Sequence, residues 1–315
     1  MKNPGVVALG GGHGLYASLS ALRRVTDRLT AVVTVADDGG SSGRLRRELG
    51  VLPPGDLRMA LAALCGDDQW GRTWSEVVQH RFRSQGDLHE HAVGNLLIVA
   101  LWELLGDTVE GLDWVGRLLG AQGRVLPMST VPLDIVADVL GVDPDRPLEI
   151  TRVRGQVECA STSGKVQSVS LVPEGPPASP EAVEAVYEAD WVVFGPGSWF
   201  TSVLPHLKVP ELHRALVETR ARRVVALNLA PQPGETDDFS QQAHLDVLHA
   251  HAPDLRVDVV LADAGVVEDH EALGKSAQRL GGELLLADVA MRDGSPRHDP
   301  ALLAQAFVQI FASGA

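Results

Sequence analysis

Residues 6–17 read VVALGGGHGLYA, an apolar run that passes directly into glycines. The run predicts a buried strand and the residues after it predict a helix, so the glycines lie at a strand–helix junction. Gly12, Gly14 and Ala17 fit a fingerprint for phosphate binding, because glycine lets the backbone approach an anion and the following helix directs its free N–H groups at it. A merely tight turn is the alternative. We expect phosphate contacts from Gly11, Gly12, His13, Gly14 and Leu15.

The absent side chain of Gly14 is expected to leave room for the phosphate itself. Substitution of Gly14 by valine should then abolish binding and leave the fold largely intact.

A second predicted strand, residues 29–36, runs into DDGGSSGR at residues 37–44. Asp37 follows Ala17 by about 20 residues, the usual distance to the acid that binds a ribose hydroxyl in dinucleotide-binding folds. Paired carboxylates beside hydroxyl and backbone donors also suit Mg²⁺ that bridges to phosphate, so Asp37 and Asp38 are expected as metal ligands. A solvated turn that caps the next helix is the alternative. The other expected ligand contacts here are Gly40, Ser41, Ser42 and Arg44.

Later loops carry the same kind of groups. Asp56 and Arg58 begin one predicted helix and Asn95 begins another, where capping is as plausible as ligand contact. A further strand–glycine–helix junction offers Gly195, Gly197, Ser198 and Thr201, and the loop after the next strand offers Gln232, Glu235 and Thr236. Because ligands gather at the carboxyl ends of parallel strands, we expect these loops to form one site.

Short apolar runs alternate with longer helical patterns along the chain, which is typical of parallel strands joined by crossover helices. We therefore predict an α/β fold, a Rossmann-like three-layer sandwich with a mostly parallel sheet. The whole chain, 1–315, is taken as a single domain. Residues 124–173 alternate polar and apolar side chains, so we expect a smaller β-rich subdomain there.

The formal charge of −14 disfavours binding to nucleic acid or to an anionic membrane. The chain has two cysteines, Cys65 and Cys159, which lack the spacing of metal ligands and fit a protein of a reducing compartment. The N-terminus lacks the layout of a signal peptide, and the apolar stretch 96–102 is far shorter than a membrane span. We expect a cytoplasmic protein.

The sequence motifs indicate catalysis less clearly than they indicate ligand binding. Ser41, Ser42 and Ser198 have no histidine or lysine at an interpretable spacing. His89 and His91 flank Glu90, but spacing fixes no third metal ligand. Whether the protein is an enzyme stays open, with binding favoured.

These motifs together resemble the gluconeogenesis factor family (YvcK-like), relatives of the 2-phospho-L-lactate transferases (CofD-like). The resemblance covers nearly the whole chain. It is carried by residues 10–15, 33–46, 53–58, 94–97, 195–198, 201–205 and 232–237, and the string DDGGSSGR is its most specific part.

The resemblance implies a cytosolic factor that binds UDP-sugars such as UDP-N-acetylglucosamine and supports cell-wall precursor supply and cell shape during gluconeogenic growth. A regulated enzyme of that supply and a homo-oligomer are the implied protein partners. The transferase relatives use the matching aspartate loop with Mg²⁺, which points to Asp37 and Asp38. Two alternatives remain: a Mg²⁺-dependent phospholactyl-type transferase with a deazaflavin acceptor, and a module that binds NAD.

Overall fold

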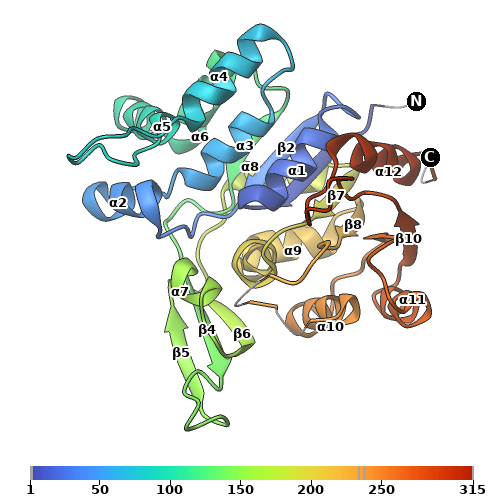
Figure 1. Ribbon diagram of the computed structural model, residues 1–315. Coiled ribbons are helices and arrows are strands. Elements are labelled where there is room, and N and C mark those ends of the chain that lie inside the picture. Colours follow the sequence, from blue (N-terminus) through green and yellow to red (C-terminus); the bar gives the residue numbers. More distant parts are fainter. Residues whose placement is uncertain (1–2, 233–234, 237–238, 314–315) are drawn as a thin grey trace.

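A seven-stranded sheet forms the centre of the protein in a computed structural model that describes residues 3–232, 235–236 and 239–313 (Figure 1). Its strand order is β10-β9-β8-β7-β1-β2-β3, and every pairing between neighbours is parallel. The strands are β1 (Val6–Gly10), β2 (Leu29–Val33), β3 (Arg124–Pro127), β7 (Trp191–Phe194), β8 (Arg222–Ala226), β9 (Val259–Asp263) and β10 (Glu283–Ala287).

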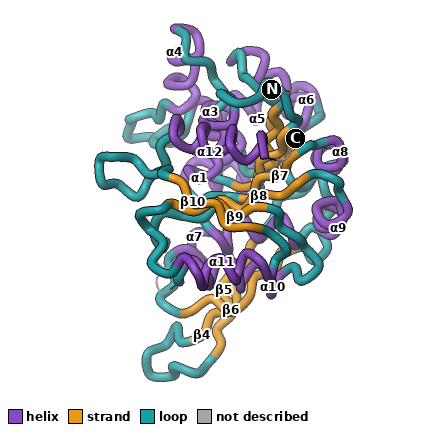
Figure 2. Tube along the Cα trace, turned by 90° about the vertical axis from the view of Figure 1, so that its right-hand side faces the viewer, coloured by secondary structure: helices purple, strands orange, loops and turns teal. Residues whose placement is uncertain are grey.

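Helices cover both faces of this sheet, as the sequence predicts for a three-layer sandwich. Figure 2 shows α1, α3 and α12 on one side of the strands and α10 and α11 on the other. The helices are α1 (Gly12–Leu22), α2 (Gly40–Leu49), α3 (Gly55–Ala63), α4 (Gln69–Gln79), α5 (Val93–Leu105), α6 (Thr108–Leu119), α7 (Gln156–Ala160), α8 (Pro180–Glu188), α9 (Pro210–Glu218), α10 (Gln241–His251), α11 (His270–Arg279) and α12 (Pro300–Ser313). A π-helical turn, η1 (Trp199–Val203), and a 3₁₀ turn, η2 (Leu204–Lys208), precede α9.

The central strands are apolar on both faces because both faces are buried. All five residues of β1, all four of β7 and all five of β9 are buried. Continuous apolar runs of this kind are typical of parallel strands between two helical layers. The predicted α/β, Rossmann-like fold is confirmed.

The middle of the chain forms a separate antiparallel sheet with strand order β5-β4-β6. Its strands are β4 (Asp134–Leu140), β5 (Ile150–Arg154) and β6 (Lys165–Val172), and it projects from the body with α7 at its base (Figure 1). The predicted β-rich subdomain started at Arg124, but residues 124–127 pair with β2 as β3. The small sheet therefore begins ten residues later than expected, at Asp134.

The helices α4, α6 and α11 begin with ordinary aspartate caps. Asp68, Asp107 and Asp269 each accept a hydrogen bond from the third amide of the helix that follows, at 2.8, 2.7 and 2.9 Å. The helices α1, α2, α3, α5, α8 and α9 have no side-chain cap of their own, and the first four of these begin near Asp37, Asp56 or Arg58. Since the first amides of a helix need an acceptor, their uncapped starts mark where an external acceptor could bind.

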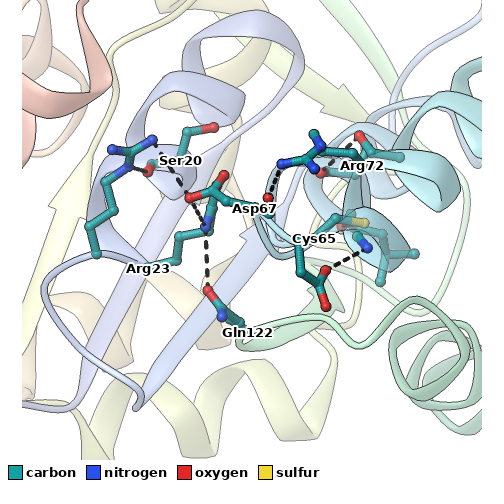
Figure 3. Close-up of polar contacts among 12 residues, drawn as sticks. Ser20, Arg23, Cys65, Asp67, Arg72 and Gln122 are labelled. Atoms are coloured by element: carbon teal, nitrogen blue, oxygen red, sulfur yellow. Dashed lines mark hydrogen bonds and ion pairs between the residues drawn. The ribbon is translucent and has the colours of Figure 1, made fainter.

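A polar cluster ties together the opposite end of this helical layer (Figure 3). Arg23, at the end of α1, donates to Asp67 at 2.5 Å and to Gln122 at 3.4 Å, and Arg72 donates to the backbone carbonyl of Asp67. The hydrogen bond from Arg23 is the largest cause that lowers the pKa of Asp67. This cluster fixes the C-terminal end of α1, which helps to hold its N-terminal end at the strand ends.

Within the described residues, Cys65 and Cys159 are buried and free. None of the helices in the same residues combines the length and the apolar character of a membrane span.

Candidate functional site at the strand ends

The order in which successive strands are added to the sheet reverses between β1 and β7, although the strands themselves are parallel. From β1 the chain proceeds to β2 on one side, and from β7 it proceeds to β8 on the other. In open parallel sheets such a switch point leaves a crevice at the carboxyl ends of the two strands, where ligands bind. The loops after β1 and β7, residues 11–14 and 195–198, meet there: a Cβ added to Gly14 would lie 2.2 Å from the carbonyl oxygen of Pro196.

That close approach corrects the expectation for Gly14. The Cβ direction of Gly14 faces the backbone of Pro196 and Gly197, so glycine is required for packing between the loops and not to leave room for phosphate. Leu15 is also different from the expectation, since its side chain is 1% exposed and its amide bonds to the carbonyl of Gly11 at 3.3 Å.

Gly12 is the open position of the first loop. Its φ of +56° lies in the left-handed region, and a Cβ there would meet nothing within 4 Å. Gly12 begins α1, and within the described residues the amides of His13 and Gly14 donate no hydrogen bond. The first turn of α1 therefore has free donors beside open space, as the sequence predicts for an anion site.

The carboxyl groups of Asp37 and Asp38 point in different directions. Asp37 accepts from the amide of Gly39 at 2.9 Å, and a Cβ on Gly55 would lie 2.6 Å from its Oδ2. Asp38 accepts from the amide of Val157 at 3.1 Å, in the first turn of α7. Asp38 thus caps the helix at the base of the small sheet, which departs from the predicted pairing of Asp37 and Asp38 on one metal ion.

Asp56 lies beside Asp37, in the position expected for Asp38. Its carboxylate accepts from the amide of Gly12, and a Cβ on Gly11 would lie 2.4 Å from its Oδ2. Burial, and then the nearby charge of Asp37, raise the pKa of Asp56 to about 7, while burial also raises the pKa of Asp37. Two such carboxyl groups gain from a proton or a cation between them.

A buried chain of hydrogen bonds positions Arg58 next to these acids. The Nε of Arg58 donates to Asn95 Oδ1 at 3.0 Å, Asn95 Nδ2 donates to Ser41 Oγ at 3.1 Å, and Ser41 Oγ lies 3.0 Å from His91 Nδ1. Burial lowers the pKa of Arg58 to about 10, so the guanidinium stays charged at neutral pH. In the described part of the chain its two Nη groups donate no hydrogen bond, which leaves them for an anion.

Ser41, Ser42 and Asn95 act as positioning residues in this arrangement. Ser41 Oγ also accepts from the amide of Ala92 at 3.3 Å, and Ser42 Oγ accepts from the amide of Gly55 at 2.9 Å. The Ser41–His91 pair was missed from the sequence because fifty residues separate the two. With the Ala92 amide and Asn95 Nδ2 donating to its hydroxyl, Ser41 is a structural link between α2 and α5.

Arg44 and Gly40 lie at the edge of the site. Arg44 donates to the carbonyls of Asp87 and His89 at 3.2 and 2.6 Å, so it holds the loop before α5 and does not face a phosphate. Gly40 has a φ of +45° and open space around its Cβ direction. No cluster of three or more His, Cys, Asp or Glu side chains with metal-ligand geometry occurs in the residues that the structure describes.

The loop after β7 is closed by a carboxylate of the protein. Glu235, 7% exposed, accepts from Ser198 Oγ at 2.6 Å and from the amides of Phe200 and Thr201 at 2.8 and 2.9 Å. The sequence predicted Ser198, Thr201 and Glu235 as separate ligand contacts, but they satisfy one another. The donors of this junction have the arrangement of an anion-binding site, and the carboxylate of Glu235 occupies the position of the anion.

Other predicted residues of these loops are also tied to the protein. The carbonyl of Gly195 accepts from Ser18 Oγ at 2.8 Å, and Thr236 Oγ1 accepts from the amide of Gln232 at 2.8 Å. Asn228 holds Gly197 from both ends, accepting from its amide and donating to its carbonyl at 2.8 Å each. Pro233, Gly234 and Asp237 of the predicted motif lie outside the described residues. The sequence predicted no role for Asn228, which lies two residues after the end of β8.

A cleft of about 550 Å³ opens beside the first loop. The sequence did not predict it, because part of its wall comes from the far C-terminal segment. Its lining residues are His13, Gly14, Tyr16, Ala17, Pro196, Gly197, Asn228, Leu229, Ala230, Pro231, Gln232, Met291, Pro296, Arg297, His298 and Pro300.

The family model for the 2-phospho-L-lactate transferase CofD matches residues 6–290, which include the loops after β1, β2, β7 and β8. The chain belongs to the CofD family. Among relatives in this family, a "Putative gluconeogenesis factor" from Mycobacterium tuberculosis strain H37Rv is 56% identical over 303 residues, covering 95% of this chain and 88% of the relative. A "Gluconeogenesis factor" from Listeria monocytogenes is 36% identical over 318 residues, covering 97% and 95%.

A solved structure also resembles this CofD-family chain. The crystal structure of a member of the UPF0052 family from Bacillus halodurans superimposes with a TM-score of 0.85 at 33% identity, covering 98% of this chain and 99% of that one. The resemblance to gluconeogenesis factors and to CofD proteins that the motifs indicate is confirmed.

Proposed function

We propose that the protein is a regulatory factor that binds a nucleotide-sugar, a UDP-sugar such as UDP-N-acetylglucosamine, by its diphosphate. The observation that carries the proposal is the first turn of α1, where the amides of His13 and Gly14 have no acceptor in the described residues, beside Asp56 and the charged Arg58. Free amides at a helix start and a buried cation are the groups that bind phosphate in proteins. A net charge of −14 does not oppose this, because the local donors are much closer to the ligand.

Mg²⁺ fits the same place. It prefers one or two carboxylates plus phosphate oxygens, and Asp37 with Asp56 supplies two carboxyl groups whose charges oppose each other. We propose this pair in place of Asp37 with Asp38 as the metal ligands. When bound, the ion would neutralise charge on the diphosphate. NAD shares a diphosphate and a ribose with UDP-sugars, so it belongs in the same set of candidate ligands.

Regulation is favoured over turnover by the side chains of the site. The hydroxyls of Ser41 and Ser198 are engaged in hydrogen bonds within the protein, and relatives that are 56% and 36% identical to this chain carry the name of a factor. The factor would act in the cytoplasm on an enzyme of cell-wall precursor supply during gluconeogenic growth, as a homo-oligomer or alone.

Calorimetry against UDP-N-acetylglucosamine, UDP and NAD, each with Mg²⁺ and with chelator, tests this function. We expect a uridine nucleotide to bind and Arg58→Ala to weaken it at least about 10-fold, because a charge-assisted contact is lost. Arg83→Ala is the matched control, since Arg83 is an exposed arginine in the segment between α4 and α5, which does not follow a strand of the sheet. Absence of binding by every uridine nucleotide would contradict the proposal.

A transferase is the second candidate, favoured by the match to the CofD family model and by the Asp37–Asp56 pair. An alcohol of a deazaflavin would attack the phosphorus of a nucleotide diphosphate donor. The P–O bond to the nucleoside monophosphate would break, that group leaving with the electron pair, and Asp56 could take the proton of the alcohol. Failure to form product from donor, acceptor and Mg²⁺ would exclude this reaction.

A further inference from the structure

The cleft beside the first loop is built from three distant parts of the chain. Tyr16 and Ala17 come from α1, Leu229–Pro231 follow β8, and Met291 with the residues up to Pro300 precede α12. Its volume of about 550 Å³ lies within the roughly 300–1,000 Å³ of small-molecule pockets. It is therefore large enough for a flat ring system with its attached ribose.

The walls of the cleft are mostly apolar. They include the phenol ring of Tyr16, the imidazoles of His13 and His298, and several prolines and aliphatic side chains. Among the polar side chains that face it, Asn228 bonds both ends of Gly197 and Arg297 donates to Ser295 and Asp293, while Gln232 Oε1 is buried with no hydrogen-bond partner in the described residues. A sugar with many hydroxyls would find few partners on these apolar walls, whereas an aromatic base would bury its two apolar faces and could donate an edge N–H to Gln232.

The cleft lies next to the proposed phosphate position. Gly12, with its open Cβ direction, and Tyr16 are four residues apart in α1, about 6 Å along the helix axis. Asp56 contacts Gly11 and Gly12, while His13 and Gly14 line the cleft, so the loop separates an acidic half from an apolar half. A ligand with phosphate at Gly12 would have one end in each half.

We propose that this cleft holds the nucleobase of the ligand, stacked against Tyr16, and that the diphosphate and sugar extend toward Asp37, Asp56 and Arg58. The inference rests on the proposed nucleotide binding and adds which part of the nucleotide enters which half of the site. Tyr16 is then a specificity-determining residue, and the acidic half of the site binds the phosphates without contacting the base.

Tyr16→Ala tests the inference, and the chain offers a matched control because its only other tyrosine, Tyr187, is exposed on α8 outside the cleft. Affinities for UDP-N-acetylglucosamine, UDP and inorganic pyrophosphate with Mg²⁺ are measured by calorimetry. We expect Tyr16→Ala to weaken the sugar nucleotide and UDP alike, by about 10-fold, as for loss of a base–aromatic stack. Pyrophosphate should change less than twofold, and Tyr187→Ala should change none of them.

A second variant separates the inference from a folding defect. Ala230→Phe fills the cleft from the opposite wall, from a half-buried loop position, and is expected to give the same pattern with an unchanged thermal midpoint. If either variant leaves UDP affinity unchanged, or weakens only the sugar nucleotide, the base lies elsewhere and the inference is overturned while nucleotide binding stands. If the wild-type protein binds no uridine nucleotide, the proposed function fails and the inference falls with it.

Discussion

The loops after β1 and β7 read alike in the sequence but differ in the structure. Both follow a buried strand, both contain glycines, and both lead into a helical turn. The loop after β1 leaves the amides of His13 and Gly14 without a partner in the described residues, whereas the amides of Phe200 and Thr201 donate to Glu235. A glycine junction therefore indicates donors, and only the rest of the chain decides whether a ligand or the protein accepts from them.

Both loops also face a carboxylate, but under different conditions. Glu235 accepts from a hydroxyl and two amides, which oppose the rise in its pKa that burial causes. Asp56 has the amide of Gly12 and the repelling charge of Asp37. The first loop is thus the one whose state should respond to protons, metal and ligand, and the following predictions test that difference.

The largest effect is expected for Gly14→Val, at the contact between the two loops. Because the Cβ position is 2.2 Å from the Pro196 carbonyl oxygen, the variant should lose more than about 4 kcal/mol of unfolding free energy or fail to fold. Urea denaturation measures this. A stable variant that has lost only ligand affinity would show that the loops do not pack as described.

The next effect is a pH dependence from Asp56, whose pKa rises from 3.8 to about 7 on folding. Between these values the folded protein holds a proton that the unfolded chain has released, so the unfolding free energy falls as the pH rises through this range. The fall amounts to a few kcal/mol, since each pKa unit corresponds to about 1.4 kcal/mol.

Denaturant unfolding at several pH values measures that slope. Asp56→Asn should flatten it, and saturating Mg²⁺ should reduce it in the wild-type protein. A slope of the same size in Asp56→Asn would exclude this carboxyl as its source.

Glu235→Gln should cost about 2 kcal/mol of unfolding free energy, because the acceptor for three donors loses its charge. Nucleotide affinity should stay within a few-fold of wild type if the loop after β7 is closed to ligand. Exposed Glu174→Gln is the matched control. A large loss of affinity with unchanged stability would mean that Glu235 contacts the ligand directly.

The smallest effect is expected for Asp38→Ala, which removes the acceptor for Val157 and should cost about 1 kcal/mol. Its Mg²⁺-dependent nucleotide affinity should match that of the wild-type protein, while Asp37→Ala should lose the Mg²⁺ dependence. Calorimetry with and without chelator distinguishes the two. Equal losses of Mg²⁺ dependence would restore the adjacent pair as the metal ligands.

The sequence predicts those parts of this protein that depend on local pattern. Apolar runs predicted β1 and β7 because both faces of each strand are buried, and glycines marked the junctions that follow them. β3 was assigned to the subdomain because an edge strand as short as residues 124–127 carries no distinct pattern.

The partners of the polar groups could not be predicted in the same way. Whether Asp37 faces Asp38 or Asp56, and whether Ser198 faces a ligand or Glu235, depends on where distant loops meet. Ser41 and His91 show the same limitation, since no spacing rule relates an α2 hydroxyl to a residue before α5.

The cleft has its first wall near the start of the chain, at residues 13–17, and its last near the end, at residues 291–300. A molecule held between them would join the two termini-proximal segments like a non-covalent crosslink. During synthesis on the ribosome, the ligand could bind between both walls only after residue 300 has been added to the chain. Loss of the chain from Met291 onward would remove that wall and leave one side of the cavity open, although the last strand of the sheet ends earlier, at Ala287.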